Sequence, residues 1–128
     1  MSLWEEFDFE ARIVEILRDH AGRDHHMGPA FLSPYQIAIE FARRHPLDYQ
    51  RLEQQGFSMG GEGAGARNSL PQYIGKELSS RRLATIEGGF LSSCHMEDLF
   101  LSFEGQRIQS SLTRSGFDLS LFRVRPGQ

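Results

Sequence analysis

The sequence contains only one cysteine, Cys94, in 128 residues. One cysteine cannot form an internal disulfide, which favours a protein of a reducing compartment. No run of about 18 apolar residues occurs, so the pattern of a membrane-spanning helix is missing. The acidic first residues also lack the basic start and continuous apolar stretch of a signal peptide. We therefore expect a cytoplasmic protein of a bacterium or phage that has no membrane partner.

Lysine is also scarce, since Lys76 is the single lysine and the sequence has thirteen arginines. Arginine favours planar, bidentate contacts. The net charge of −3 argues against non-specific wrapping of nucleic acid, because that affinity comes from neutralising phosphates. The charge is uneven, with ten acidic and six basic residues in 1–56 and seven acidic and eight basic residues in 57–128. Any contact with DNA is therefore expected in the second part of the chain.

Patterns that carry catalysis or bind metal are scarce as well. Cys94–His95 are adjacent, but neighbours in a strand point to opposite faces, so they do not form a nucleophile and its base. His20 and His25–His26 lack a zinc-ligand spacing. The glycine-rich segment Gly60–Gly65 is not followed by the Gly-Lys-Ser/Thr of a phosphate-binding loop. We therefore predict a protein that is not an enzyme, with no catalytic residue, cofactor or metal.

Helical periodicity is present in 9–20, 34–44 and 70–81, where apolar residues recur every three to four positions. The second and third of these segments begin alike. Ser33 and Ser69 are predicted N-caps, each followed by a proline in the first turn and by a glutamine that completes a capping box. Gly75 lies in the middle of the third helix, where glycine costs about 1 kcal/mol relative to alanine. This cost favours a close approach to another helix.

The period changes from helical to alternating after residue 82. Residues 83–93 are typical of a strand that ends at its glycines, 99–103 and 107–112 of a hairpin, and 117–124 of a further strand. We expect all strand pairing to be antiparallel. The predicted core consists of Ile13, Leu17, Ile37, Phe41, Tyr73, Ile74, Leu78, Leu101, Phe103 and Leu119.

The order of three helices, a strand, a hairpin and a strand resembles the winged-helix architecture over about residues 7–124. The resemblance implies one α+β domain, 1–128, in which three helices are followed by an antiparallel hairpin and a small sheet. In that architecture the third helix enters the major groove of DNA. Glutamine and asparagine can read adenine, and arginine can read guanine. The candidate nucleic-acid-binding residues are Arg67, Asn68, Ser69, Gln72, Lys76, Arg81 and Arg82.

Two functions follow from these patterns. The first is a small, sequence-specific DNA-binding protein in transcription regulation, which uses helix 69–81 and hairpin 99–112 on duplex DNA and acts as a homodimer. The second is a protein-interaction module without nucleic-acid activity, such as an adaptor, an inhibitor or an immunity-type protein, whose acidic, aromatic start "LWEEFDF" docks on a protein partner. In both cases we expect the segment Gly60–Gly65 to be mobile until a partner is bound.

Overall fold

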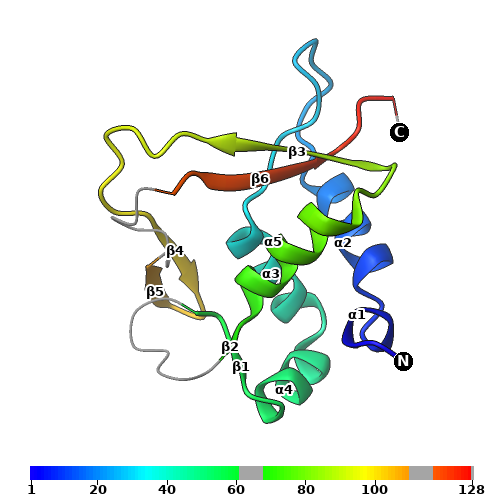
Figure 1. Ribbon diagram of the computed structural model, residues 1–128, viewed down its shortest axis with the longest axis vertical. Coiled ribbons are helices and arrows are strands. Elements are labelled where there is room, and N and C mark those ends of the chain that lie inside the picture. Colours follow the sequence, from blue (N-terminus) through cyan, green and yellow to red (C-terminus); the bar gives the residue numbers. More distant parts are fainter. Residues whose placement is uncertain (61–67, 110–116, 128) are drawn as a thin grey trace.

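The computed structural model describes residues 1–60, 68–109 and 117–127, and its fold is α+β, as predicted. Helices pack together on one side, and two antiparallel strand pairs lie along their edges (Figure 1). The elements are α1 (Leu3–Glu6), α2 (Phe9–Asp19), α3 (Pro34–Arg44), α4 (Pro46–Gln54), β1 (Phe57–Ser58), β2 (Asn68–Ser69), α5 (Leu70–Arg81), β3 (Ile86–Leu91), β4 (Phe100–Phe103), β5 (Gln106–Gln109) and β6 (Leu119–Val124).

The three predicted helices are confirmed as α2, α3 and α5. At the start of α3 the capping box is complete. The Ser33 N–H donates to Gln36 Oε1 at 2.7 Å, and the Gln36 N–H donates to Ser33 Oγ at 3.3 Å. At the start of α5 the Gln72 N–H donates to Ser69 Oγ at 3.2 Å. Each bond satisfies a backbone N–H that has no partner within its own helix.

The prediction of three helices was too low, because α1 and α4 are also helical. Ser2 caps α1 by accepting the Glu5 N–H at 3.2 Å. Pro46 follows His45, the C-cap of α3, and begins α4. Proline suits the first position of a helix, because the N–H that it lacks would have no helical partner there.

The core is built around Phe9, which has no exposed surface. Its ring centroid lies 5.5 Å from that of Trp4, 4.9 Å from Phe41 and 5.7 Å from Tyr73, so one side chain joins α1, α2, α3 and α5. Seven of the ten predicted core residues are buried. The other three, Tyr73, Leu101 and Phe103, are half-buried. Phe103 stands on the two-stranded hairpin, and its ring packs edge-on against that of Tyr49.

The larger strand pair joins β3 to β6 in antiparallel register, from Ile86↔Val124 to Leu91↔Leu119. Leu32, which lies between α2 and α3, adds a bridge on the other side of β6, where Leu32 and Phe122 exchange two hydrogen bonds of 2.8 Å. The described elements follow the predicted order of helices before strands, with α4 added between the second and third predicted helices. β3 runs through Gly88 and Gly89, so our expectation that the strand ends at its glycines was wrong, because β6 pairs along its whole length.

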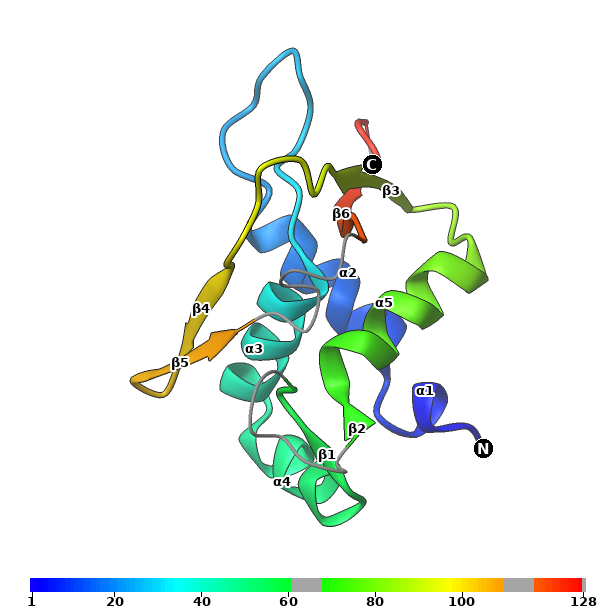
Figure 2. The ribbon, with the colours of Figure 1, turned by 60° about the vertical axis from the view of Figure 1, so that its left-hand side comes forward.

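The hairpin β4–β5 lies within the connection between β3 and β6 and turns at Glu104–Gly105, both of which have positive φ. In the described residues β5 ends at Gln109, and 110–112 of the predicted strand lie outside the described part of the chain. Figure 2 shows α3 between this hairpin and α5. The hairpin contacts α3 and therefore does not extend the outward face of α5.

One strand pair contradicts the expectation of purely antiparallel pairing. β1 and β2 are parallel over two residues, with Phe57 opposite Asn68 and Ser58 opposite Ser69. The Asn68 N–H also donates to the Gly56 carbonyl at 2.9 Å. The pair is parallel because the chain leaves α4 and enters α5 in the same direction along this edge. No helix within the described ranges is both long and apolar enough to cross a membrane.

Candidate functional site

The outward face of α5 is polar. Leu70, Ile74 and Leu78 turn into the core, whereas Gln72 and Lys76 are exposed one turn apart. The predicted close approach at Gly75 is confirmed, because a methyl group there would lie only 3.1 Å from Pro34 Cγ of α3. α5 is therefore held tightly against α3 along one side while its Gln72–Lys76 side stays open.

Most of the arginines in the described chain are engaged in ion pairs within the molecule. Short contacts include Arg12 Nη1 to Asp48 Oδ2 and Arg44 Nη1 to Asp19 Oδ2, at 2.7 and 2.8 Å. On α5 and its C-cap, however, Lys76 and Arg82 have no acidic partner among the residues that the structure describes. The remaining ion pairs of arginine are Arg43–Glu40, Arg44–Glu40, Arg51–Glu6, Arg51–Asp48, Arg81–Glu77, Arg123–Glu87 and Arg125–Glu87.

Arg81 and Arg82 are adjacent in the sequence, but their side chains lie next to different parts of the molecule. Arg81 Nε lies 3.0 Å from Glu77 Oε2, and its guanidinium stacks over the Trp4 ring at 4.7 Å from the centroid. Arg81 thus links α5 to α1. Arg82 is turned toward β3 and lines the groove between α5 and the β3–β6 pair. Of the two, only Arg82 has a guanidinium that is available to a ligand.

Arg82 also has a costly backbone, with φ 51° and ψ 53° at the C-cap of α5. A side chain in this left-handed region costs about 1–3 kcal/mol, and glycine is the residue usually found there.

Arg82→Gly should therefore raise the free energy of unfolding by about 0.5–1 kcal/mol. The gain is smaller than the full cost of the strained backbone, because glycine also has more freedom in the unfolded chain. Urea denaturation measures this change in the free energy of unfolding. Ser80→Gly, inside the helix, should instead lower the free energy of unfolding by about 1 kcal/mol. A loss of stability in both variants would contradict the prediction.

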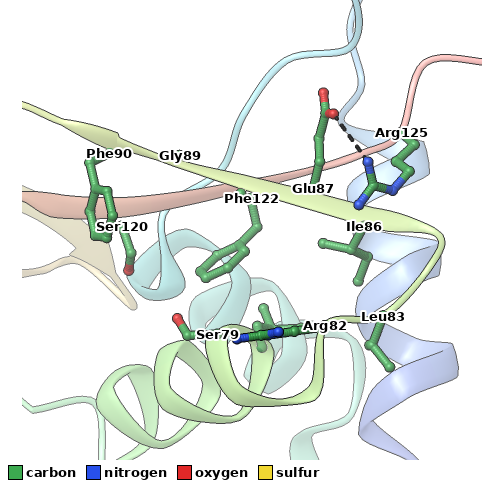
Figure 3. Close-up of a pocket in the computed structure, with 12 residues that line it drawn as sticks. Ser79, Arg82, Leu83, Ile86, Glu87, Gly89, Phe90, Ser120, Phe122 and Arg125 are labelled. Carbon is green, nitrogen blue, oxygen red and sulfur yellow. Dashed lines mark ion pairs between the residues drawn. The ribbon is translucent and has the colours of Figure 1, made fainter.

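The groove next to Arg82 has a volume of about 730 Å³. In Figure 3, Ile86 and Phe122 point from the sheet toward α5, and Arg82 extends along the helix below them. Phe90 stands at the far end of β3 with 74% of its surface exposed. Phe90 was not among the site residues predicted from the sequence. The signal that could have found it is a phenylalanine directly after two glycines in a strand, where no neighbouring side chain covers it.

The predicted site residues lie at different places along α5. Asn68 is exposed and Ser69 half-buried in β2, at the N-terminus of the helix, and Arg67 lies outside the described residues. Gly60 comes so close to Ser69 that a methyl group there would lie 2.5 Å from Ser69 Oγ. Arg82 is at the opposite end of a twelve-residue helix, which is about 18 Å long. Asn68, Gln72 and Lys76 can therefore share one ligand surface, and Arg82 can join it only if the ligand is as long as the helix.

The histidines and the cysteine lie outside this surface. The rings of His25 and His26 stack at 4.1 Å between centroids in the loop before α3, and Cys94 is exposed between β3 and β4. In the described ranges no three residues of His, Cys, Asp or Glu come together to hold a metal ion. Comparison of the chain with protein-family models, with curated proteins and with solved structures finds no match.

Proposed function

We propose that this protein is a small, non-enzymatic DNA-binding regulator that places the outward face of α5 in the major groove of duplex DNA. The observation that supports the proposal best is the distribution of arginine partners. Acidic residues pair with Arg12 of α2 and with all arginines of α3 and α4, whereas Lys76 and Arg82 are left without an acidic partner among the described residues. These two cations lie on the helix that corresponds to the recognition helix in a winged-helix arrangement.

In this mechanism the two kinds of side chain have different tasks. Gln72 offers an amide donor and acceptor, the pair of groups that reads adenine in the major groove. Lys76 and Arg82 contact phosphates and fix the position of the helix on the duplex. The Ser69 end of α5 adds backbone N–H groups and the positive end of the helix dipole, which favour a phosphate.

The number of phosphate contacts that one chain can make bears on whether the protein binds DNA as a monomer or a dimer. The two cations of this surface give one chain only a weak electrostatic attraction to DNA, because each neutralised phosphate contributes about one released counterion. Two copies on neighbouring half-sites double that number. We therefore propose that the protein binds DNA as a homodimer in the cytoplasm.

Fluorescence anisotropy with a labelled duplex at several salt concentrations tests the function. Lys76→Ala and Arg82→Ala should each weaken binding and lower the slope of log affinity against log salt by about one. Gln72→Ala should leave the slope unchanged and reduce the preference between duplex sequences, since it removes a base contact.

Arg23→Ala is the matched control, because Arg23 is an exposed arginine in the loop before α3, far from α5 in the sequence, and it forms no ion pair with the residues that the structure describes. Its removal changes the net charge equally and should leave the salt slope almost unchanged. If the unmodified protein does not bind any duplex at roughly 100 μM and low salt, the upper end of ordinary non-specific affinity, the DNA-binding proposal is wrong.

A further inference from the structure

The strand β3 has one edge that no other strand covers in the described part of the chain. Its sheet has the order Leu32, β6, β3, so β3 is the outer strand. Edge strands usually carry lysine, proline or a bulge that prevents another strand from pairing. β3 carries none of these, and the residues at its centre are Gly88, Gly89 and the exposed Phe90.

The hydrogen bonds of β6 show which backbone groups of β3 point outward. The Arg125 N–H donates to the Thr85 carbonyl at 2.9 Å, which marks these two residues as a hydrogen-bonded pair. Hydrogen-bonded and non-hydrogen-bonded pairs alternate in an antiparallel ladder. Gly88↔Phe122 and Phe90↔Ser120 are consequently non-hydrogen-bonded pairs. Phe122 confirms this, because its N–H and carbonyl are used by Leu32 on the other side.

The backbone N–H and carbonyl groups of Gly88 and Phe90 therefore point to the free edge, while those of Gly89 point to β6. Gly88 is exposed, so a second strand can approach its backbone. Adding a strand at such an edge is a general way for a domain to bind an extended peptide.

The groove along this edge determines the side chains that such a peptide needs. Ile86, Phe90 and Phe122 give the sheet side of the groove an apolar surface, suited to small apolar side chains. The charged groups of the lining are Arg82, Glu87 and Arg125. Glu87 is already paired with Arg123, and its other oxygen lies 3.7 Å from Arg125 Nη1. Within the described ranges the guanidinium of Arg82 has no acidic partner, so it can pair with a carboxylate of the ligand.

We propose that the groove between α5 and β3 binds an extended segment of a partner protein, which pairs as an additional strand with Gly88 and Phe90. Every second side chain of this segment faces the groove, and these side chains are apolar except for one carboxylate. Apolar side chains rest on Ile86, Phe90 and Phe122, and a carboxylate of the segment pairs with Arg82. This proposal shares Arg82 with the DNA-binding proposal but does not depend on it, because peptide binding uses the edge of β3 and neither Gln72 nor Lys76.

The experiment is amide hydrogen exchange followed by NMR. The probe is a synthetic nine-residue peptide with valine and serine alternating, in which one glutamate replaces a valine and therefore faces the same side as the remaining valines. At a peptide concentration ten times the dissociation constant, exchange at Gly88 and Phe90 should slow about tenfold. Exchange at Gly89 should change little, because its N–H already faces β6. Alternation between neighbouring residues is the signature of strand addition, and a peptide that merely lies in the groove does not produce it.

Two variants and a second peptide test the chemistry of the groove. Arg82→Ala and Phe90→Ala should each weaken peptide binding about tenfold, whereas Leu47→Ala, at a residue of 75% exposure on α4, should not. A peptide with lysine in place of glutamate should bind at least about tenfold more weakly. Lys76→Ala, which should weaken DNA binding, should leave peptide binding unchanged.

Several results would overturn the proposal. One is exchange at Gly88 and Phe90 that stays constant up to roughly 1 mM peptide, the weak end of measurable binding. Another is equal binding of the lysine peptide. Exchange that slows with rising protein concentration in the absence of peptide would assign the edge to a second copy of the chain. Equal protection of Gly88 by duplex DNA would make the groove part of the DNA site.

Discussion

Replacement of Phe9 by alanine is expected to lower the free energy of unfolding by about 3–5 kcal/mol. Phe9 is completely buried, and its ring contacts the rings of Trp4, Phe41 and Tyr73. Alanine would leave a cavity between four helices whose backbones cannot all move inward, because Gly75 already holds α5 close to α3. Since small domains are stable by only about 5–15 kcal/mol in total, a large part of the variant could unfold on moderate warming. Urea denaturation followed by circular dichroism measures the loss.

Phe90→Ala is the matched control for this experiment, because it makes the same change at a ring that is 74% exposed. It should alter stability by less than about 0.5 kcal/mol, the usual range for surface substitutions. If Phe9→Ala costs less than about 1 kcal/mol, Phe9 does not hold the helices together in the way we describe.

Glu40→Gln is expected to destabilise the protein at pH 7 by up to about 3 kcal/mol, and the loss should disappear in acid. The Arg43 guanidinium donates to both oxygens of Glu40 at 2.9 and 2.8 Å, and Arg44 Nε donates at 3.0 Å. These bonds, with Arg43 contributing most, lower the pKa of Glu40 from 4.5 to about 2 although burial acts in the opposite direction. Each pKa unit corresponds to about 1.4 kcal/mol, and the exposure of Arg43 makes the full sum an upper value.

The direction of the pH dependence follows from the lowered pKa. The charged form of Glu40 is favoured in the folded state, so its contribution is complete above pH 4.5 and is lost as the pH falls toward 2. Glutamine resembles the protonated carboxyl, and the two proteins should therefore have similar stability near pH 2. Chemical denaturation across this range tests the prediction. Glu53→Gln, at an exposed residue of α4, should change stability by less than about 0.5 kcal/mol at pH 7. A Glu40→Gln loss that is the same at pH 7 and pH 2.5 would contradict the assignment.

The sequence predicted the helices best where a local signal existed. Ser33 and Ser69 cap α3 and α5 as expected, because a cap and the first turn lie within four residues of one another. Pro46 shows the limit of such signals. The same residue can end one helix or begin another, and the difference depends on the packing of Tyr49 and Leu52, which α4 buries.

The long-range contacts were not predictable from periodicity. β3 and β6 pair across an intervening hairpin, and the pairing of Phe57 with Asn68 brings together segments that carry no repeating pattern. The candidate site was predictable as a helix face, since Gln72 and Lys76 lie one turn apart. The different directions of the Arg81 and Arg82 side chains were not predictable, because they follow from the stacking of Arg81 on Trp4 and from the left-handed backbone of Arg82.

The stacking of Arg81 on Trp4 gives this protein a built-in optical reporter. Trp4 is its single tryptophan, buried to 3% exposure, and the indole Nε1 has no hydrogen-bond partner within the described residues. Its emission therefore comes from one apolar environment and one neighbouring guanidinium, which lies near the C-terminal end of α5. Fluorescence at this one site consequently reports whether α1 remains docked on α5, and a ligand that draws Arg81 away from the ring becomes visible without any added label.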